Sequence, residues 1–335
     1  MSQNVPAAPA AVSPAESSTI RVSDAPQASW AKGRERLGWL MVLPSLLIVA
    51  AVALYPLVES FRLSFTNARL ASNRAVENIG FNNYRYLWEN DNFRIAFKNT
   101  LKFTVASVTI ELVLGIVVAL IINSQFQGRG VMRAAILIPW AIPTVVSSRL
   151  WAYMLNDNYG VLNDLLVYQL PRLFSWIPLI GDNIAGIFPD QKIAFLARPN
   201  LALPSAIAVD VWKTTPFMAL LILAGLQIIP GDVYEAAVVD GASKWKQFWQ
   251  ITLPLLRPAI LVALIFRTLD AFRVFDVIYV MFGAKVETLT LSIYTQQALV
   301  DGDRLGRASA ASVIIFLCIG VFVLIYTRLV KVEEV

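Results

Sequence analysis

The chain has 335 residues, of which 57% are hydrophobic and only 15% are charged, with a formal net charge of +5. This apolar fraction exceeds what a soluble domain needs to fill its core, and it comes in blocks, so the composition indicates a membrane protein. No histidine and one cysteine are present, which excludes an internal disulfide and removes the usual zinc ligands. We therefore predict no metal site and no cofactor.

The first segment, residues 1–36, differs in composition from the rest of the chain. Its stretch "VPAAPAAVSPAESS" is rich in Ala, Pro and Ser and cannot bury enough apolar surface to fold. It also lacks the cleavage pattern of a signal peptide. We predict a disordered tail over residues 1–36, on the cytoplasmic side.

Six apolar blocks are long enough to cross a bilayer, which requires about 20 residues. The middle four contain ionisable residues and should therefore face protein or water. The sequence predicts an all-α, multi-pass membrane domain over residues 37–330 with six transmembrane helices, at residues 37–58, 103–122, 134–155, 202–229, 258–282 and 308–327.

Six spans place both termini on one side of the membrane. Lys and Arg counts over whole loops do not orient the chain, but charges next to span ends carry more weight. Lys32, Arg34 and Arg36 precede the first span, and Arg328 and Lys331 follow the last. We therefore predict cytoplasmic termini, extracytoplasmic loops at about 59–102, 156–201 and 283–307, and a cytoplasmic loop at 230–257.

The loop 230–257 contains the unusual stretch "EAAVVDGASKWKQFWQITLPLL". Asp232 is predicted to cap a short helix that Gly241 ends, and Ser243 to cap a second helix that stops near Pro254. An amphipathic hairpin at the membrane surface would explain the two tryptophans. It would not explain the small residues at the bend, which suit a knob that enters a socket on another protein.

The same stretch resembles the EAA signature of permease subunits of ATP-binding-cassette (ABC) importers. The matching positions are Glu235-Ala236-Ala237, Asp240-Gly241-Ala242, Phe248, Ile251 and Leu253-Pro254. The segments "GFNNYRYLWENDNFRIAFKNTLKF" (80–103), "DVWKTTPFM" (210–218) and "FRVFDVIYV" (272–280) are similar to the carbohydrate branch, especially permeases for disaccharides such as trehalose and maltose. The resemblance implies the type I ABC importer permease fold.

In that family the EAA helix docks in a cleft of a cytoplasmic ATPase. The resemblance therefore implies that the ATPase-coupling residues are Glu235, Ala236, Ala237, Asp240, Gly241 and Ala242. It also implies four kinds of partner: a second permease subunit, two ATPase subunits, an extracytoplasmic sugar-binding protein and the sugar, with no nucleic acid, at the bacterial inner membrane. The chain has no phosphate-binding Gly-x-x-x-x-Gly-Lys-Ser/Thr loop, so we expect a transport subunit rather than an enzyme, with ATP hydrolysed by a partner.

Charged residues inside the fourth and fifth predicted spans raise two alternatives. Their spacing of three allows i,i+3 salt bridges within one helix, at Asp210 and Lys213 and along the series Arg267, Asp270, Arg273 and Asp276. Alternatively, they line a hydrated sugar path. Matching to maltose-type relatives implies the second role, with Asp210, Lys213, Thr214, Phe217, Asp270 and Arg273 binding substrate. For Glu111 and Arg149 we favour pairing with charges on neighbouring helices.

A membrane-embedded enzyme and a secondary transporter are the alternatives to this function. A membrane-embedded enzyme would need a catalytic constellation, and the one Asp-x-Asp match, at residues 301–303, is more typical of a solvated turn. We predict no catalytic residues. A secondary transporter, or an ABC permease for another small polar solute, stays open as an alternative, and the sequence does not predict which sugar is carried.

Overall fold

The computed structural model describes residues 25–72, 75–175 and 187–329. Within these ranges the regular structure is helical, apart from a single antiparallel bridge between Thr66 and Asn78. This confirms the all-α prediction. The chain divides into two units, residues 1–57 and 58–335.

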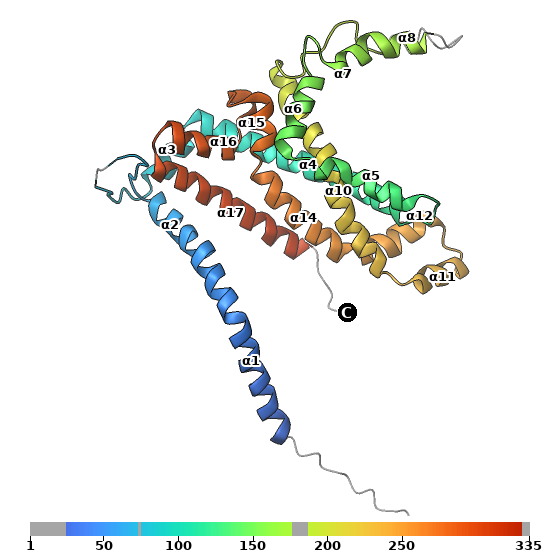
Figure 1. Cartoon of the computed structure of the whole chain (residues 1–335), viewed down its shortest axis with the longest axis horizontal. Helices are drawn as coiled ribbons and strands as arrows, with labels where there is room; N and C mark the ends of the chain where they lie inside the picture. Colours follow the sequence, from blue (N-terminus) through green and yellow to red (C-terminus); the bar gives the residue numbers. More distant parts are fainter. Residues whose placement is uncertain (1–24, 73–74, 176–186, 330–335) are drawn as a thin grey trace, which may run out of the picture. The chain divides into compact units, whose positions relative to one another are not determined.

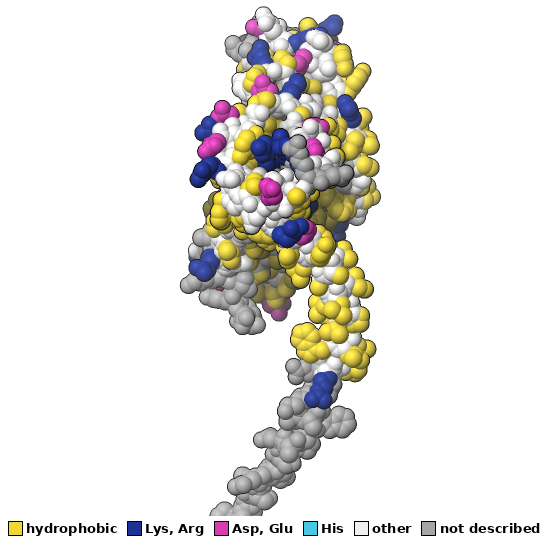
Figure 2. Space-filling model, turned by 90° about the vertical axis from the view of Figure 1, so that its left-hand side faces the viewer, with side chains coloured by type: hydrophobic (Ala, Val, Ile, Leu, Met, Phe, Trp, Pro, Cys, Tyr) yellow, Lys and Arg dark blue, Asp and Glu magenta, His cyan; other side chains and the backbone are white. Residues whose placement is uncertain are grey.

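The described part of the first unit is helical, and its last helix continues past residue 57 into the second unit. Helix α1 (Ala25–Val49) continues through the π-helical turn η1 (Ala50–Leu54) into α2 (Tyr55–Ser64). From Leu37 onward most of its apolar side chains are exposed, as Figure 2 shows in yellow. Such a surface suits lipid or another protein. The helix begins at Ala25, so the predicted tail boundary at residue 36 is wrong, and residues 1–24 of that tail lie outside the described residues.

The second unit is built around three helices that pack against one another: α4 (Asp91–Asn123), α10 (Pro199–Ile228) and α14 (Arg257–Phe272). Helix α17 (Leu305–Leu329) packs against α14 (Figure 1). Gly115 allows the close approach of α4 to α10, because a Cβ there would lie 2.6 Å from Met218 Cγ. Small residues of this kind are common where membrane helices meet.

Two of the predicted spans are broken. Residues 134–155 fall on α5 (Arg129–Ala141) and α6 (Thr144–Met154), which meet at 88°. The cause lies in Pro143, which has no N–H and cannot continue the α5 ladder. In the described part of the chain, four unbroken helices are long and apolar enough to cross a membrane, or up to six if each bent pair is one span. The prediction of six spans therefore agrees with the structure, although the third is an elbow rather than a straight helix.

The fifth predicted span, 258–282, is also interrupted. Helix α14 ends at Phe272, and α15 (Asp276–Phe282) begins after a short non-helical stretch. A second bend of 64° separates α14 from the helical segment that ends at Leu255. The break between α14 and α15 places backbone and polar side chains beside the middle of α10.

Shorter helices cover the two ends of the second unit. One end carries α3 (Asn82–Glu89), α16 (Leu291–Gln296), η4 (Val286–Thr288) and η5 (Gln297–Asp301), while α7 (Val161–Asp164), η2 (Leu165–Gln169) and α8 (Leu170–Phe174) follow α6. Figure 2 looks onto the α3 end, where Lys, Arg, Asp and Glu side chains gather. The other end of α10 carries α11 (Gly231–Val239), α12 (Lys244–Gln247), η3 (Phe248–Thr252) and α13 (Leu253–Leu255) (Figure 1).

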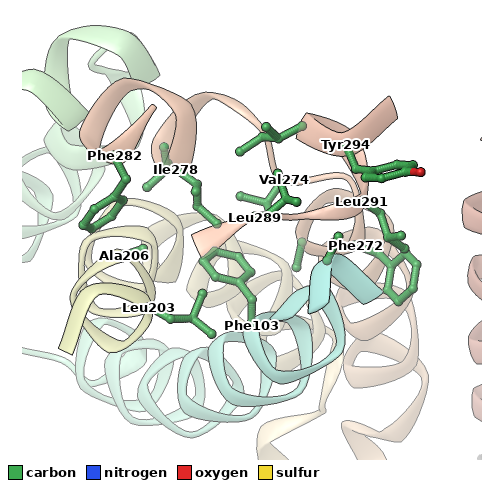
Figure 3. Close-up of a cluster of buried hydrophobic side chains, with 14 of the residues drawn as sticks. Phe103, Leu203, Ala206, Phe272, Val274, Ile278, Phe282, Leu289, Leu291 and Tyr294 are labelled. Carbon is green, nitrogen blue, oxygen red and sulfur yellow. The ribbon is translucent and has the colours of Figure 1, made fainter. Parts of the chain in front are cut away.

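The main hydrophobic core lies where α4, α10, α14 and α15 meet. Figure 3 shows Phe103 of α4, Leu203 of α10 and Ile278 of α15 pointing toward one another, with Leu289 beside them. Because lipid tails are as apolar as these side chains, close packing rather than exclusion from water holds membrane helices together. This core fixes the helices whose polar residues form the site described next.

Candidate functional site

A cavity of about 440 Å³ lies between the α5–α6 elbow, the middle of α10 and the α14–α15 junction. Five of the six predicted substrate-binding residues line it: Asp210, Lys213, Thr214, Asp270 and Arg273. The sixth, Phe217, is not in the lining, but its ring stacks on Trp140 at a centroid distance of 5.9 Å. Trp140 is itself part of the cavity wall. The structure therefore brings the predicted residues of two distant segments into one site.

Several lining residues were missed as site residues at the sequence level. Arg267 and Asp276 were predicted only as members of a charged series, while Trp140, Thr144 and Phe275 were not singled out. Trp140 and Thr144 flank Pro143 in the elbow. A proline inside an apolar block was the available signal, because broken membrane helices often line a cavity.

One buried arginine organises the polar wall. The Arg267 side chain is 2% exposed and binds three carboxylates. Its Nε donates to Glu111 Oε2, its Nη2 donates to Glu111 Oε1 at 2.9 Å and to Asp210 Oδ2, and its Nη1 donates to Asp270 Oδ2 at 2.7 Å. We call Glu111, Asp210, Arg267 and Asp270 the Arg267 clasp. Burying charges is costly unless they are paired in this way.

The ion pairs of the clasp can be compared with the predicted pairing of the charged residues. The i,i+3 pair of Arg267 with Asp270 is present, and Glu111 pairs with a charge on a neighbouring helix as predicted. Among the described residues no ion pair joins Asp210 to Lys213 or Asp270 to Arg273, so mutual pairing is wrong there. The Arg149 side chain is exposed and forms no ion pair with any described residue. The prediction that Arg149 pairs with a charge on a neighbouring helix is therefore also wrong.

The members of the clasp differ in their access to the cavity. Glu111 is fully buried and does not line it, whereas the Asp270 side chain is 75% exposed. The Thr214 hydroxyl lies 2.7 Å from both Glu111 Oε1 and the Asp210 carbonyl oxygen, and its single proton can serve only one of them at a time. Asp270 is thus the carboxylate of the clasp that a solute can reach most easily.

Lys213, which was predicted to bind substrate, lines the cavity and also contacts the α5–α6 elbow. Its Nζ donates to the backbone oxygen of Ile142 at 2.6 Å and to that of Trp140 at 3.4 Å. These carbonyls lie at the break after α5, where helical N–H partners are missing. The buried ammonium group therefore holds the α5–α6 elbow against α10, and less of its hydrogen-bonding capacity remains for a solute.

Replacing Lys213 with methionine should destabilise the protein by about 1–3 kcal/mol, because the elbow carbonyls lose their buried donor. Thermal unfolding of the purified protein in detergent measures the change. Lys192→Met is the matched control, since Lys192 Nζ also donates to a backbone oxygen, that of Asn158 at 2.6 Å, but on the surface. We expect a change within about 0.5 kcal/mol there. Equal losses in the two variants would contradict the role given to Lys213.

The hairpin after α10 has the predicted bend. Gly241 adopts a φ of +74°, and the Ala242 N–H donates to the Ala237 carbonyl at 2.9 Å, which is a glycine-ended helix terminus. Ser243 Oγ accepts from the Lys246 N–H, so the predicted second cap is confirmed. The prediction that Asp232 is the first cap is wrong, because Pro230 occupies that position and Asp232 lies in the first turn of α11.

Most of the predicted coupling residues form an exposed surface. Glu235, Ala236, Asp240 and Gly241 are exposed, Ala242 is half-buried and Ala237 is buried. A Cβ at Gly241 would meet nothing within 4 Å. The apolar side chains of Val239 and Trp245 are also exposed beside this bend, at 87% and 71%. We call residues 235–242 the coupling bend.

Comparisons with known proteins agree with this organisation. The chain is 40% identical over 296 residues to the trehalose/maltose transport system permease protein of Thermococcus litoralis, covering 88% of this chain and 93% of that one. It is 39% identical to the trehalose transport system permease protein of Mycobacterium tuberculosis strain H37Rv, with 88% of each chain covered.

Solved structures give the same result. The chain is similar to a bacterial ABC transporter involved in the import of the acidic polysaccharide alginate, with a TM-score of 0.70 and 25% identity over 92% of this chain and all of that one. The ABC importer permease fold is thereby confirmed. A sequence profile described as "Binding-protein-dependent transport system inner membrane component" matches residues 111–332, which include the cavity, the clasp and the coupling bend. The chain belongs to the family of binding-protein-dependent transport system inner membrane components.

Proposed function

We propose that the chain is the permease subunit of an ABC importer for a sugar, specifically a disaccharide such as trehalose or maltose, and forms half of its path across the membrane. The observation that carries the proposal is a polar cavity inside an otherwise apolar bundle, lined by α10 and α14. These helices flank the coupling bend in the chain. The names of the relatives, which are trehalose and maltose permeases, support the same substrate class.

The chemistry of the cavity suits a neutral solute with many hydroxyls. The lining contains the carboxylates of Asp210, Asp270 and Asp276 and the cations of Lys213, Arg267 and Arg273, so its formal charges cancel. Sugar hydroxyls both donate and accept hydrogen bonds, and they match such a mixed wall. The volume of about 440 Å³ falls in the range of small-molecule sites, roughly 300–1,000 Å³.

The coupling bend is the proposed contact with a cytoplasmic ATPase subunit. Its exposed small residues allow close approach, and Glu235 supplies a carboxylate for a basic residue of the cleft. We propose the full complex as this chain, a second permease subunit, two ATPase subunits and an extracytoplasmic sugar-binding protein. A solved relative that contains a periplasmic protein bound to an alginate pentasaccharide supports the last of these. The proposed location is a bacterial inner membrane.

In this proposal both termini are cytoplasmic, on the same side as the coupling bend. The segments at about 59–102, 156–201 and 283–307 then face outward. Six membrane crossings are consistent with termini on one side, if each bent helix pair is one span. Single cysteines introduced near residue 80 and near residue 240 test the orientation, since only the first should react with an impermeant reagent in intact cells.

Co-purification tests the proposal. The chain, co-expressed with the proposed second permease subunit and the ATPase subunits, should be isolated with the ATPase and reconstituted in liposomes. We expect trehalose or maltose, presented by the binding protein, to stimulate ATP hydrolysis. A chain that moves solute without any associated ATPase would support a secondary transporter instead.

Arg273→Gln should raise the KM for sugar uptake roughly 5- to 150-fold, the range that corresponds to about 1–3 kcal/mol for one lost polar contact. Arg273 lines the cavity, is exposed, and forms no ion pair among the described residues, so its guanidinium is available to hydroxyl oxygens. Arg149→Gln is the control, because Arg149 is also exposed but lies outside the cavity lining. An unchanged KM in Arg273→Gln would remove Arg273 from the sugar site.

A further inference from the structure

The Arg267 clasp joins three helices at one guanidinium. Glu111 belongs to α4, Asp210 to α10, and Arg267 and Asp270 to α14. One cation faces three carboxylates, so the clasp has a formal charge of −2. A single carboxylate would be enough to neutralise Arg267 for packing alone. The second buried carboxylate adds a desolvation cost, and the third, Asp270, is exposed to the cavity. The excess indicates a role beyond holding helices together.

We propose that Arg267 is a positioning residue that links the sugar cavity to the coupling bend; this inference rests on the proposed function. Arg267 binds Asp210 and Asp270 through adjacent nitrogens, Nη2 and Nη1. The orientation of both cavity carboxylates therefore depends on one side chain. A sugar hydroxyl that binds Asp270 either replaces the hydrogen bond from Arg267 Nη1 or binds beside it. In both cases the position of the Arg267 guanidinium changes, and with it the hydrogen bonds to Glu111 and Asp210.

The covalent connections of the clasp lead directly to the coupling bend. Helix α10 continues from Asp210 to Ile228 without a break, roughly 27 Å at 1.5 Å per residue, and α11 follows three residues later. Helix α14 begins at Arg257, just after α13 ends at Leu255. Both ends of the segment that contains the bend thus continue into helices that Arg267 ties together. A displacement of the bend reaches the cavity through both helices, while the contact with Glu111 adds α4 to the same unit.

Glu111 provides a test of this arrangement because it cannot touch the sugar. Its carboxylate is fully buried and outside the cavity lining, and it binds Arg267 and Thr214. Glu111→Gln keeps the size of the side chain and removes the charge. If Arg267 positions Asp270, this change should raise the KM for sugar uptake by about 5-fold, which corresponds to roughly 1 kcal/mol, the size of one typical hydrogen bond.

The experiment compares Glu111→Gln, Asp270→Asn and the double variant in proteoliposomes that contain the complete complex. Residues that act through a shared partner are not additive. Multiplying the fold-increases in KM of the two single variants gives the value for independent effects. We expect the fold-increase in KM of the double variant to be at most about half of that value. Asp91→Asn is the matched control on α4, since it removes an exposed ion pair with Arg94 far along the helix from Glu111, and should leave KM unchanged.

The outcomes separate the two proposals. A Glu111→Gln complex that assembles poorly but transports with wild-type KM would overturn the positioning role, and so would full additivity with Asp270→Asn. If Glu111→Gln yields no complex, Glu111→Asp gives the same test, because its shorter side chain keeps the charge but cannot hold both nitrogens of Arg267. A wild-type complex that takes up no sugar would overturn the proposed function itself.

Discussion

Replacing Gly241 with tryptophan should leave the protein in the membrane but lower the rate of sugar uptake by about 100-fold or more, which corresponds to roughly 2.7 kcal/mol. Gly241 has a φ of +74°, which L side chains rarely adopt, and it lies on the exposed coupling bend. A Cβ meets nothing within 4 Å in the chain itself, so the bulk of the indole projects away from the protein and into whatever docks there. We expect the variant to lose its association with the ATPase, measured by co-purification, and to lose ATP-driven uptake.

Gly80→Trp is the matched control for this change. Gly80 also has a positive φ, of +59°, and open space around its missing Cβ, but it precedes α3 at the opposite end of the second unit. Backbone strain is therefore similar in the two variants, and only Gly241→Trp obstructs the proposed socket. Normal uptake and normal ATPase association in Gly241→Trp would refute docking through the coupling bend.

Arg267→Met should cause the largest loss of stability among single changes at the site. It leaves the buried carboxylates of Glu111 and Asp210 without their cation, and removing one partner of a buried ion pair costs about 3–5 kcal/mol. Folded proteins are stable by only about 5–15 kcal/mol. We expect a lower Tm of the purified complex and a large fall in the yield of monodisperse protein.

The triple variant Arg267→Met, Glu111→Gln and Asp210→Asn separates stability from function. It removes the unpaired charges along with the cation, so the yield and Tm should recover in part. Sugar uptake should not recover, because Asp270 stays without its positioning partner and the Asp210 carboxylate is gone. A wild-type Tm in Arg267→Met alone would contradict the structural cost assigned to the clasp.

Much of the fold was predictable because it depends on residues that are close together in the sequence. Long apolar blocks predict membrane helices. Gly241 followed by Ser243 predicts the end of one helix and the capped start of the next, and the structure has both. The positions matched to sugar permeases also meet at one cavity, apart from Phe217. These features depend on neighbouring residues or on similarity to a family, both of which a single sequence carries.

The spacing of three predicted the pair of Arg267 with Asp270, but the other partners of the charged residues were not predictable. A spacing of three suggests that Asp270 faces Arg273, but α14 ends at Phe272, so Arg273 leaves the helix and the shared face is lost. Exchanging the charges of Asp270 and Arg273 would consequently break the pair with Arg267 and would not test mutual pairing. The contact of Arg267 with Glu111 spans 156 positions, and no periodicity reveals it. Tertiary packing decides such contacts.

The central claim is most directly tested by sugar accumulation in proteoliposomes that contain the complete complex, with binding protein outside and ATP inside. We expect labelled trehalose or maltose to accumulate against its gradient only when ATP is hydrolysed, and Gly241→Trp to abolish this while Gly80→Trp does not. Accumulation driven by an ion gradient without ATP, or ATP-driven accumulation of another solute with neither sugar transported, would contradict the account.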